Sequence, residues 1–330
     1  MQKTNVPQDR KHRITIRRIA DACGVSMPTV SRVLHNHPNI SPETRCRIEA
    51  EIKRAGYRSP RRKRSGLVLL VSSDRPKLIN GEYYYHMINA IQRRFLECNC
   101  RCIVTDLHSL RTLGCLHLDG IIVIDNSSDL PEKWAREHAL PVIMLNRPRM
   151  RLTDNSYSLR SDDIDAMEKA VSMLYSHGHR KIGLLLIGTH SWNNEQRRHG
   201  FLQAMAKFGL KAQAVIGHAP GSDNLVELGR LVSSGITGLI CPAEGSGIGV
   251  LHTLWMFKVM VPRDLSFVCW ETDGISSNWN PPLSTIGQDF DGFAEYCCRI
   301  ILDDPALPRG EREFVIPNRV FERDSVKSIL

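Results

Sequence analysis

The sequence predicts a small all-α unit at the amino terminus, followed by an α/β core of two doubly wound parallel-sheet lobes. Three observations lead to this prediction. Apolar residues repeat with helical spacing between residues 14 and 57, and after Gly66 short apolar runs typical of buried strands alternate with helical patterns. A length of 330 residues also exceeds what one small head and one ordinary domain require.

The first predicted helix follows Thr15, a residue type that caps helix amino termini. Its apolar residues fall at helical spacing and form one face: Ile16, Ile19, Ala20 and Cys23. Gly24 is placed where the chain must leave the helix with a positive φ, and Val25 is expected to return to the core.

The second predicted helix is capped by Ser26 and buries Val30, Val33 and Leu34. The remaining residues face outward or flank the buried stripe: Met27, Pro28, Thr29, Ser31, Arg32 and His35. A short helix with polar groups at its amino-terminal turn is typical of a recognition helix in the major groove of DNA.

A third helix is predicted to begin at Ser41-Pro42-Glu43, which supplies a cap, a proline at the first position and an acid in the first turn. Gly56 is expected to end it. Any small three-helix unit shows such apolar stripes, so the periodicity alone does not establish DNA binding.

Positive charge is concentrated in the amino-terminal part of the chain. Residues 1–64 contain 16 Lys and Arg against 5 Asp and Glu, whereas the rest of the chain contains 28 against 30. This asymmetry favours a phosphate-binding surface on the head over a general role in solubility.

After Gly66 the chain is predicted to alternate strands with helices, a pattern that indicates parallel sheets covered by helices on both faces. The predicted strands are 67–71, 102–105, 120–124, 142–145, 182–187, 238–241 and 266–270. The predicted helices are 84–96, 131–138, 163–177, 195–208, 224–233, 248–257 and 290–302.

The head resembles the helix-turn-helix headpiece of LacI-type transcription regulators, the lactose and galactose repressor family. The resemblance is carried by Ile19-Ala20, Gly24-Val25-Ser26, Thr29 to Leu34, Ser41, Thr44-Arg45 and Gly56-Tyr57. It implies that Thr15, Ser26, Thr29 and Ser31 hold phosphates, that Met27 and Pro28 vary with the operator, and that Arg32 reaches a base edge. Pro28 offers only an apolar surface, such as one for a thymine methyl.

The rest of the chain resembles the periplasmic-binding-protein-like core of the same regulators. The motifs are 118–122, 178–182, 197–201, 281–286 and 323–325. The implied organisation is a basic arm (1–13), the headpiece (14–57), a short basic linker (58–65) and a core (66–330). The core is expected to divide into a first lobe (66–161 and 289–316) and a second lobe (162–288 and 317–330).

The resemblance also implies an effector site in the cleft between the lobes. Arg197 matches the effector-binding arginine of the family, and Glu271 stands where most members carry aspartate. Asn146, followed by Arg147, replaces a common aspartate, Tyr84 belongs to an aromatic pair with Tyr83, and Trp192 could stack on a sugar face. In the alternative interpretation, these residues merely pack and pair in a crevice.

The linker departs from the family pattern. Family members carry a hinge helix whose leucine enters the minor groove, but residues 58–65 contain no leucine and no helical pattern. The basic run Arg61, Arg62, Lys63 and Arg64 could lie along the DNA backbone or enter a narrow groove, or it could be a solvated linker.

Other site classes are weakly supported. The ten cysteines include no C-x-x-C pair, and those at 98, 100 and 102 are expected to be reduced thiols of a cytoplasmic protein. Gly245 to Gly249 lacks dinucleotide-binding spacing, and His177-Gly178-His179 has no ligand set nearby. We therefore expect no metal, no cofactor and no catalytic residues, and no apolar run of membrane-spanning length is present.

These observations lead us to expect a non-enzymatic, homodimeric repressor that binds a pseudo-palindromic operator in double-stranded DNA, with a sugar-like metabolite modulating the affinity. Helices 84–96 and 290–302 are the expected dimer seam, by resemblance. The alternatives are a small-molecule sensor with a vestigial headpiece and a nucleotide-dependent enzyme. The sequence does not identify the effector or the operator.

Overall fold

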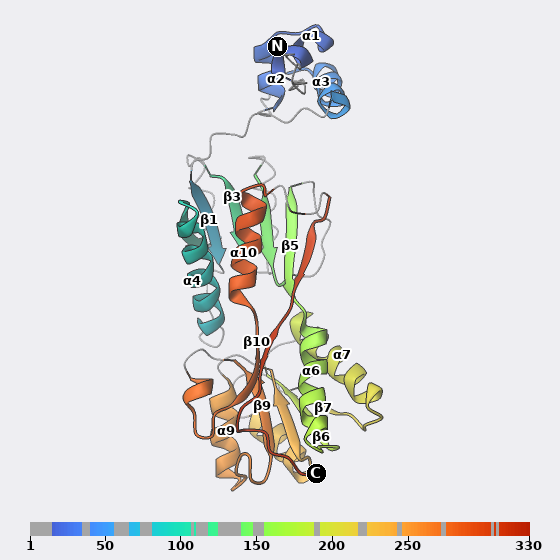
Figure 1. Cartoon of the computed structure of the whole chain (residues 1–330), viewed down its shortest axis with the longest axis vertical. Helices are drawn as coiled ribbons and strands as arrows, with labels where there is room; N and C mark the ends of the chain where they lie inside the picture. Colours follow the sequence, from blue (N-terminus) through green and yellow to red (C-terminus); the bar gives the residue numbers. More distant parts are fainter. Residues whose placement is uncertain are drawn as a thin grey trace, which may run out of the picture. The chain divides into compact units, whose positions relative to one another are not determined.

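The computed structural model folds as two compact units, residues 1–65 and 66–330 (Figure 1). It describes residues 15–34, 40–55, 66–72, 81–106, 109, 118–124, 140–147, 155–187, 192–216, 223–242, 246–271, 275–304, 307 and 310–330. Among these residues, no helix combines the length and apolar character needed to span a bilayer.

The first unit is a bundle of three short helices, α1 (Ile16–Cys23), α2 (Met27–Leu34) and α3 (Pro42–Ala55). Its buried core draws on all three helices and comprises Ile19, Ala20, Cys23, Val30, Val33 and Ile48. Gly24 adopts the left-handed conformation (φ 60°), and its N–H donates to the carbonyl of Ala20. Val25 N–H donates to the same carbonyl at 3.0 Å, which fixes the turn into α2.

The first lobe of the core is built on a six-stranded parallel sheet ordered β11-β5-β4-β3-β1-β2. Its strands are β1 (Leu67–Ser72), β2 (Arg101–Asp106), β3 (Gly120–Val123), β4 (Val142–Leu145), β5 (Ser156–Ser161) and β11 (Glu313–Ile316). Helices α4 (Gly81–Glu97) and α10 (Phe290–Ile301) cover one face of this sheet. Residues of the central strands β3 and β4 are completely buried, as expected for a parallel sheet covered on both faces.

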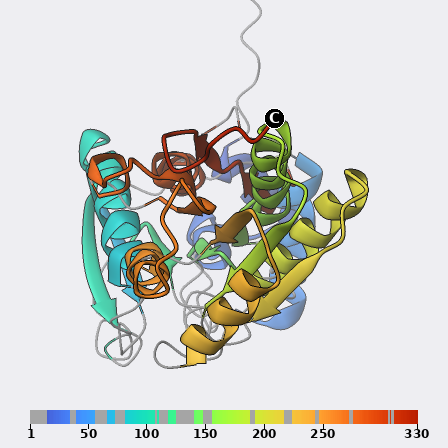
Figure 2. The ribbon, with the colours of Figure 1, turned by 90° about the horizontal axis from the view of Figure 1, so that it is seen from below.

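The second lobe is built on a sheet ordered β12-β10-β9-β8-β6-β7. Its strands are β6 (Ile182–Leu186), β7 (Gln213–Ile216), β8 (Gly238–Cys241), β9 (Ser266–Trp270), β10 (Ser284–Gly287) and β12 (Arg319–Phe321). One face packs against α6 (Asp163–Ser176) and α7 (Trp192–Lys207), and the other against α8 (Asp223–Ser233) and α9 (Ser246–Met256), as the view from below shows (Figure 2). The 3-10 helix η3 (Ser276–Asn278) precedes β10.

Close packing of α6 on α7 depends on a glycine. A Cβ placed on Gly200 would lie 2.7 Å from both the Cα and the carbonyl oxygen of Ile164. No side chain fits at that distance, so Gly200 allows α7 to approach the backbone of α6.

The predicted fold class is confirmed, with one difference in the second sheet, where β12 runs antiparallel to β10. The chain passes between the lobes three times, from β5 to α6, from β10 to α10 and from β11 to β12. In the first sheet all strands run parallel to β5, and in the second sheet all strands except β12 run parallel to β10. The carboxyl ends of these strands therefore face the boundary between the lobes. Because β12 enters the second lobe from that boundary without an intervening helix, it must run opposite to its neighbour.

Candidate functional site

The amino terminus of α2 is held in place by a side-chain cap. Thr29 N–H donates to Ser26 Oγ at 3.3 Å, and the hydroxyls of Ser26 and Thr29 lie 2.8 Å apart. On the inner side Val30 and Val33 are buried. The helix is therefore anchored on its inner side and capped at its start, and its amino-terminal end carries the positive end of the helix dipole, which favours anions.

The side chains predicted to contact DNA lie on the outer side of this helix. Ser26, Met27, Pro28 and Arg32 are exposed, with Met27 at 51% exposure, while Thr29 and Ser31 are partly buried. A 51% exposed methionine on a rigid helix offers apolar surface to a partner. His35 and the run Arg61 to Arg64 lie outside the described residues, as does the predicted helix 131–138.

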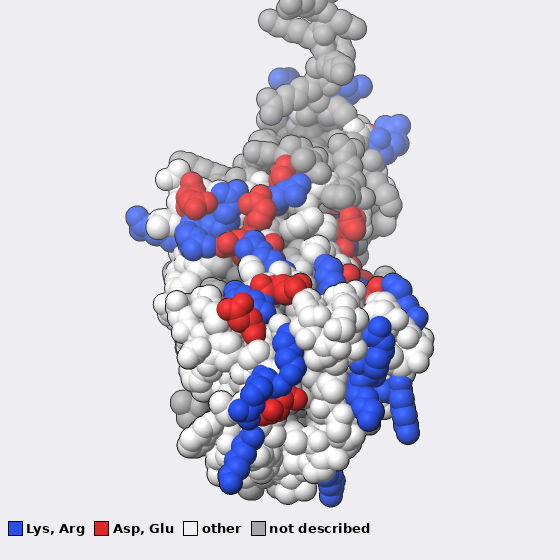
Figure 3. Space-filling model, turned by 60° about the horizontal axis from the view of Figure 1, so that its bottom comes forward, with Lys and Arg blue, Asp and Glu red and all other residues white. Residues whose placement is uncertain are grey.

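Thr15 also occupies its predicted place, because its side chain accepts a hydrogen bond from Arg18 N–H at 3.5 Å at the start of α1. Arg17 and Arg18 on α1 and Arg47 on α3 are exposed, so basic groups flank the helix pair. The core differs in charge. On the face drawn in Figure 3, acidic and basic side chains alternate in the upper part of the core, basic side chains predominate in its lower part, and wide areas are uncharged.

In the core, Asn146 lies where segments of both lobes meet. It follows β4 in the left-handed conformation (φ 50°) and is 7% exposed. Its Nδ2 donates to Tyr83 Oη at 2.9 Å and to Gln288 Oε1 at 3.0 Å, and its Oδ1 accepts from Ser161 N–H at 3.0 Å. One side chain thus links the end of β4, helix α4 and two of the three segments that connect the lobes.

Arg197 on α7 is 8% exposed and is surrounded by polar and aromatic groups. Its guanidinium carbon lies 4.2 Å from the centre of the Trp270 ring, and its NH1 donates to Pro242 O at 2.8 Å. Asp163 Oδ1 lies 3.5 Å from Arg197 Nε, but within the described part of the chain this Nε has no hydrogen-bond partner. A buried donor of this kind is available to an oxygen of a ligand or a water molecule.

Glu271 directly follows β9 and is held by Thr285 of β10 and by Arg323, which follows β12. Its Oε2 accepts hydrogen bonds from Thr285 Oγ1 and from Arg323 NH1, the latter at 2.9 Å. The carboxylate is therefore fixed in orientation and its charge is balanced by Arg323.

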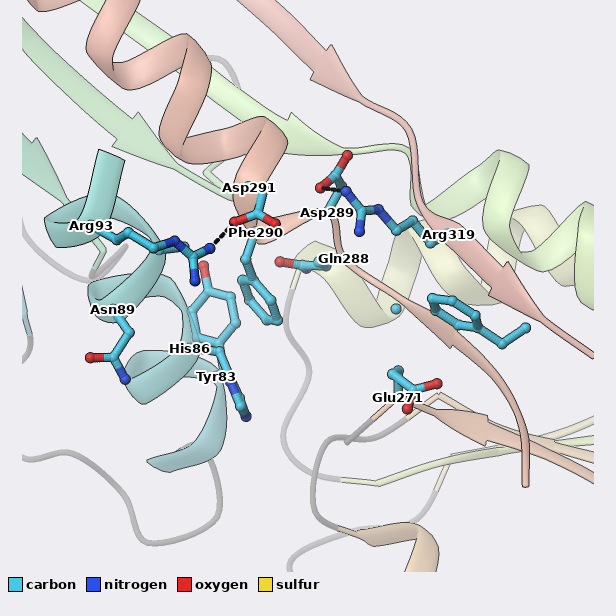
Figure 4. Close-up of a pocket in the computed structure, with 13 residues that line it drawn as sticks. Tyr83, His86, Asn89, Arg93, Glu271, Gln288, Asp289, Phe290, Asp291 and Arg319 are labelled. Carbon is cyan, nitrogen blue, oxygen red and sulfur yellow. Dashed lines mark hydrogen bonds and ion pairs between the residues drawn. The ribbon is translucent and has the colours of Figure 1, made fainter. Parts of the chain in front are cut away.

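A cavity of about 240 Å³ lies beside these groups, where α4, the start of α10 and the connecting segments meet (Figure 4). Its aromatic wall is made by Phe290, Tyr83 and His86. The centre of the Phe290 ring lies 6.1 Å from that of Tyr83 and 5.7 Å from that of His86, and the His86 ring is stacked on the Phe290 ring. The polar part of the lining includes Asn89, Arg93, Glu271, Gln288, Asp289, Asp291 and Arg319.

The acidic groups in this lining already have basic partners. Arg93 pairs with Asp291, Arg319 pairs with Asp289 at 2.6 Å, and Glu271 pairs with Arg323 outside the lining. Aromatic faces beside amides and paired charges can bind a small polar molecule by stacking and hydrogen bonding.

The residues predicted for the effector site are distributed over neighbouring places. Glu271 lines the cavity, and Asn146 contacts Tyr83 and Gln288, which also line it. Trp192 begins α7, and the guanidinium carbon of Arg160 lies over its ring, 5.9 Å from the ring centre. Tyr84 packs on the core of the first lobe, and buried Arg147 accepts a hydrogen bond from Ser158 Oγ through its carbonyl.

Several residues of the site had no usable signal in the sequence. Gln288 directly follows the strand Ser284–Gly287, and Asp163 begins α6 two residues after the strand Ser156–Ser161. Both strands have weak apolar patterns. Arg319 and Arg323 reach the site from the end of the chain. Their partners are distant in sequence, so pairing could not be inferred.

Three family models match the chain. The model for bacterial regulatory proteins of the lacI family matches residues 15–59. The model for periplasmic binding proteins and the sugar binding domain of the LacI family matches residues 104–232, and the model for a periplasmic binding protein-like domain matches residues 171–326.

Similar proteins span nearly the whole chain. An uncharacterized HTH-type transcriptional regulator in the aml 5' region of Streptomyces limosus is 27% identical and covers 97% of both chains. The probable HTH-type transcriptional repressor ExuR of Bacillus subtilis is 23% identical over 96% of this chain and 99% of its own.

Solved structures share the fold. A complex of the transcriptional regulator CelR with cellobiose has a TM-score of 0.66 at 20% identity and covers 95% of this chain and 100% of its own. The lac repressor dimer bound to operator has a TM-score of 0.65 at 20% identity, with coverage of 95% and 99%. With its helix-turn-helix head and periplasmic-binding-protein-like core, this chain belongs to the lacI family of bacterial regulatory proteins.

Proposed function

We propose that this protein is a transcription repressor that binds a pseudo-palindromic operator as a homodimer and responds to a small sugar-like effector. The observation that carries the proposal is the geometry of α2. Its inner side is anchored by Val30 and Val33, its start is capped by Ser26, and Arg32 is exposed on its outer side. A two-fold dimer would insert two such helices into successive major grooves.

The proposed DNA contacts fall into two classes. Met27, Pro28 and Arg32 read base edges, whereas the hydroxyl residues and the linker hold phosphates. The second class comprises Thr15, Ser26, Thr29, Ser31, Arg61, Arg62, Lys63 and Arg64. His35, which follows α2 in the sequence, is a further proposed DNA contact. Without a leucine in residues 58–65, the linker would contribute affinity along the backbone in place of a wedge at the operator centre.

The effector would bind in the cleft between the lobes. Similar regulators are bound to cellobiose in one structure and to ribose in another, from Enterococcus faecium. In this chain we assign the contacts to Tyr84, Asn146, Arg147, Trp192, Arg197 and Glu271, and the Arg197 Nε would donate to a ligand oxygen.

Coupling follows from the position of the cleft. A ligand that contacts both lobes favours the closed core, and a changed orientation of the first lobes in a dimer would change the spacing of the two heads.

We divide the chain into an arm (1–13), a headpiece (14–57), a linker (58–65) and a core (66–330). The first lobe is residues 66–161 and 289–316, and the second is 162–288 and 317–330. The protein would act in the cytoplasm, without catalytic activity.

The test is a mobility-shift assay of the full chain with DNA fragments from its own promoter region, with and without a panel of neutral sugars and sugar acids. We expect a specific shifted band that one ligand weakens or strengthens. Arg197→Ala should abolish the response to that ligand while DNA binding persists. The exposed neighbour Arg198→Ala is the matched control and should respond normally. A band that random DNA competes away equally well would contradict the proposal.

A further inference from the structure

Helices α4 and α10 of the first lobe lie side by side and are joined by a series of side-chain contacts (Figure 1). Arg93 pairs with Asp291, and Arg94 Nε donates to Glu295 Oε2 at 2.6 Å. Further along, Cys298 Sγ lies 3.3 Å from Cys98 Sγ. The residue numbers rise together on both helices, so the helices run parallel and these contacts fix their register.

The two sulfur atoms are close enough to bond after a small adjustment. Both cysteines are free. The sulfur atoms would have to approach by little more than about 1 Å to reach the S–S bond length of about 2.05 Å. The ion pair between Arg94 and Glu295, about one helical turn away on each helix, already holds the two helices together near this contact.

We propose that Cys98 and Cys298 form an oxidation site, in which a peroxide converts the two thiols into a disulfide that joins the end of α4 to α10. Cys98 directly follows α4, beyond the span 84–96 expected in the dimer seam, and is partly exposed, so of the two thiols it is the more accessible to a small oxidant. Cys298 is 2% exposed and lies behind it. Cys98 is therefore the residue that reacts first, and Cys298 is the partner that completes the bond.

The chemistry requires one equivalent of hydrogen peroxide. The Cys98 thiolate attacks one peroxide oxygen, the O–O bond breaks, and the products are a sulfenic acid and hydroxide, which takes up the proton of the original thiol to form water. The Cys298 sulfur then attacks the Cys98 sulfur and displaces hydroxide, which leaves as water with the Cys298 proton. Two thiols are oxidised by two electrons, and one peroxide is reduced to two water molecules.

The surrounding charges agree with this order of events. Burial raises the pKa of the Cys298 thiol to about 12, and burial likewise raises the pKa of Cys102 to about 12. Both groups are thiols at neutral pH and react slowly with peroxide, because the thiolate is the nucleophile. The positive charge of Arg94 partly opposes this rise in the pKa of Cys298.

The other cysteines of this region differ from the proposed pair. Cys100 and Cys297 are buried, and Cys102 is on β2, the edge strand of the first sheet. The contact between Cys98 and Cys298 joins residues 200 positions apart. A disulfide between them would close a long loop in the unfolded chain, so oxidation should stabilise the folded core.

The experiment uses the reduced full chain, treated with a small molar excess of hydrogen peroxide and then alkylated. We expect the intact mass to fall by two hydrogen atoms before alkylation, and a non-reducing digest to contain the peptide pair linked through Cys98 and Cys298. Dithiothreitol should restore both thiols. The oxidised protein should also unfold at a higher temperature than the reduced protein.

Three variants serve as controls. Cys98→Ser, at a partly exposed position, should fold normally, form no linked peptide and show no rise in unfolding temperature after peroxide. Cys298→Ser should also form no linked peptide, whereas Cys102→Ser should form it as the unchanged protein does. A linkage through any other cysteine, or oxidation of Cys98 to sulfinic acid while Cys298 remains free to alkylate, would overturn the proposal.

Discussion

Replacing Asn146 by alanine should weaken the junction between the lobes by an amount that can be worked out from its contacts. The change removes three hydrogen bonds, to Tyr83, Gln288 and Ser161. At a net value of about 0.5–1.5 kcal/mol each, their loss costs about 1.5–4.5 kcal/mol. Alanine in the left-handed conformation, which asparagine tolerates, adds roughly 1 kcal/mol. We expect a total loss of about 2.5–5.5 kcal/mol in the free energy of unfolding.

Asn146→Asp separates the hydrogen bonds from the backbone conformation. Aspartate tolerates the same φ, can accept from Ser161 N–H and can accept from the Tyr83 hydroxyl, but it cannot donate to Gln288 Oε1. We therefore expect a loss of only about 1–2 kcal/mol. Asn89→Ala, at an exposed position of α4 in the lining of the cavity, is the control for stability and should change it by less than about 0.5 kcal/mol.

The assay is equilibrium urea unfolding of the full chain, followed by tryptophan fluorescence. All five tryptophans lie in residues 66–330, so the signal reports on the core without a contribution from the head. If Asn146→Ala lost less than about 1 kcal/mol, these three hydrogen bonds would not hold the lobes together.

Three further predictions concern other parts of the molecule. Arg32→Ala should weaken operator binding by about 1–3 kcal/mol and relax sequence choice, whereas Arg62→Ala should weaken binding to all DNA sequences similarly. Fluorescence anisotropy with specific and random duplexes measures both affinities. If the Arg32 variant lost equal affinity for the two duplexes, its proposed role would be refuted. Gly200→Ala should destabilise the core by about 1–3 kcal/mol because its Cβ would overlap Ile164. Gly249→Ala on α9, where a Cβ meets nothing within 4 Å, should be neutral or stabilising. Thermal unfolding of the two variants compares these effects. Burial lowers the pKa of His179 below its usual value of about 6.5, so its contribution to stability is complete above that pH and is lost as the pH falls toward the lowered pKa. His179→Gln should therefore lose less stability than the unchanged protein between pH 7.5 and pH 5.5, and equal pH dependence of the urea midpoints would argue against this.

The sequence was most informative where apolar periodicity and local caps coincide. Helices α1 and α2 begin after the predicted caps Thr15 and Ser26, and Gly24 has the predicted positive φ. The central strands of both sheets also lie at predicted positions, because an apolar run such as Ile182–Leu186 has few alternatives to a buried strand.

Strands stabilised by buried polar groups were not predicted. Strand β5 reads SYSLRS, and its inward-facing serines form hydrogen bonds that hydrophobic periodicity cannot represent. Ser158 Oγ donates to the Arg147 carbonyl, and Ser161 Oγ donates to Asp163 Oδ1. The edge strands β7, β11 and β12 were missed as well, because they are short and partners from distant parts of the sequence determine them.

The site shows the same division between local and distant information. Resemblance pointed to Arg197, Glu271 and Asn146, but the groups that orient them, such as Asp163 and Arg323, depend on contacts that span many residues. The linker prediction stays a prediction, because Arg61 to Arg64 lie outside the described residues.

The central claim is that the exposed side chains of α2, a rigid helix with a side-chain cap, read the DNA sequence. Selection from a pool of randomised duplexes by the full-length protein tests this claim most directly. We expect the unchanged protein to enrich one pseudo-palindromic sequence. The Arg32→Ala variant should lose the preference at one position of each half-site. A folded protein that retains duplexes without enriching any sequence would contradict it.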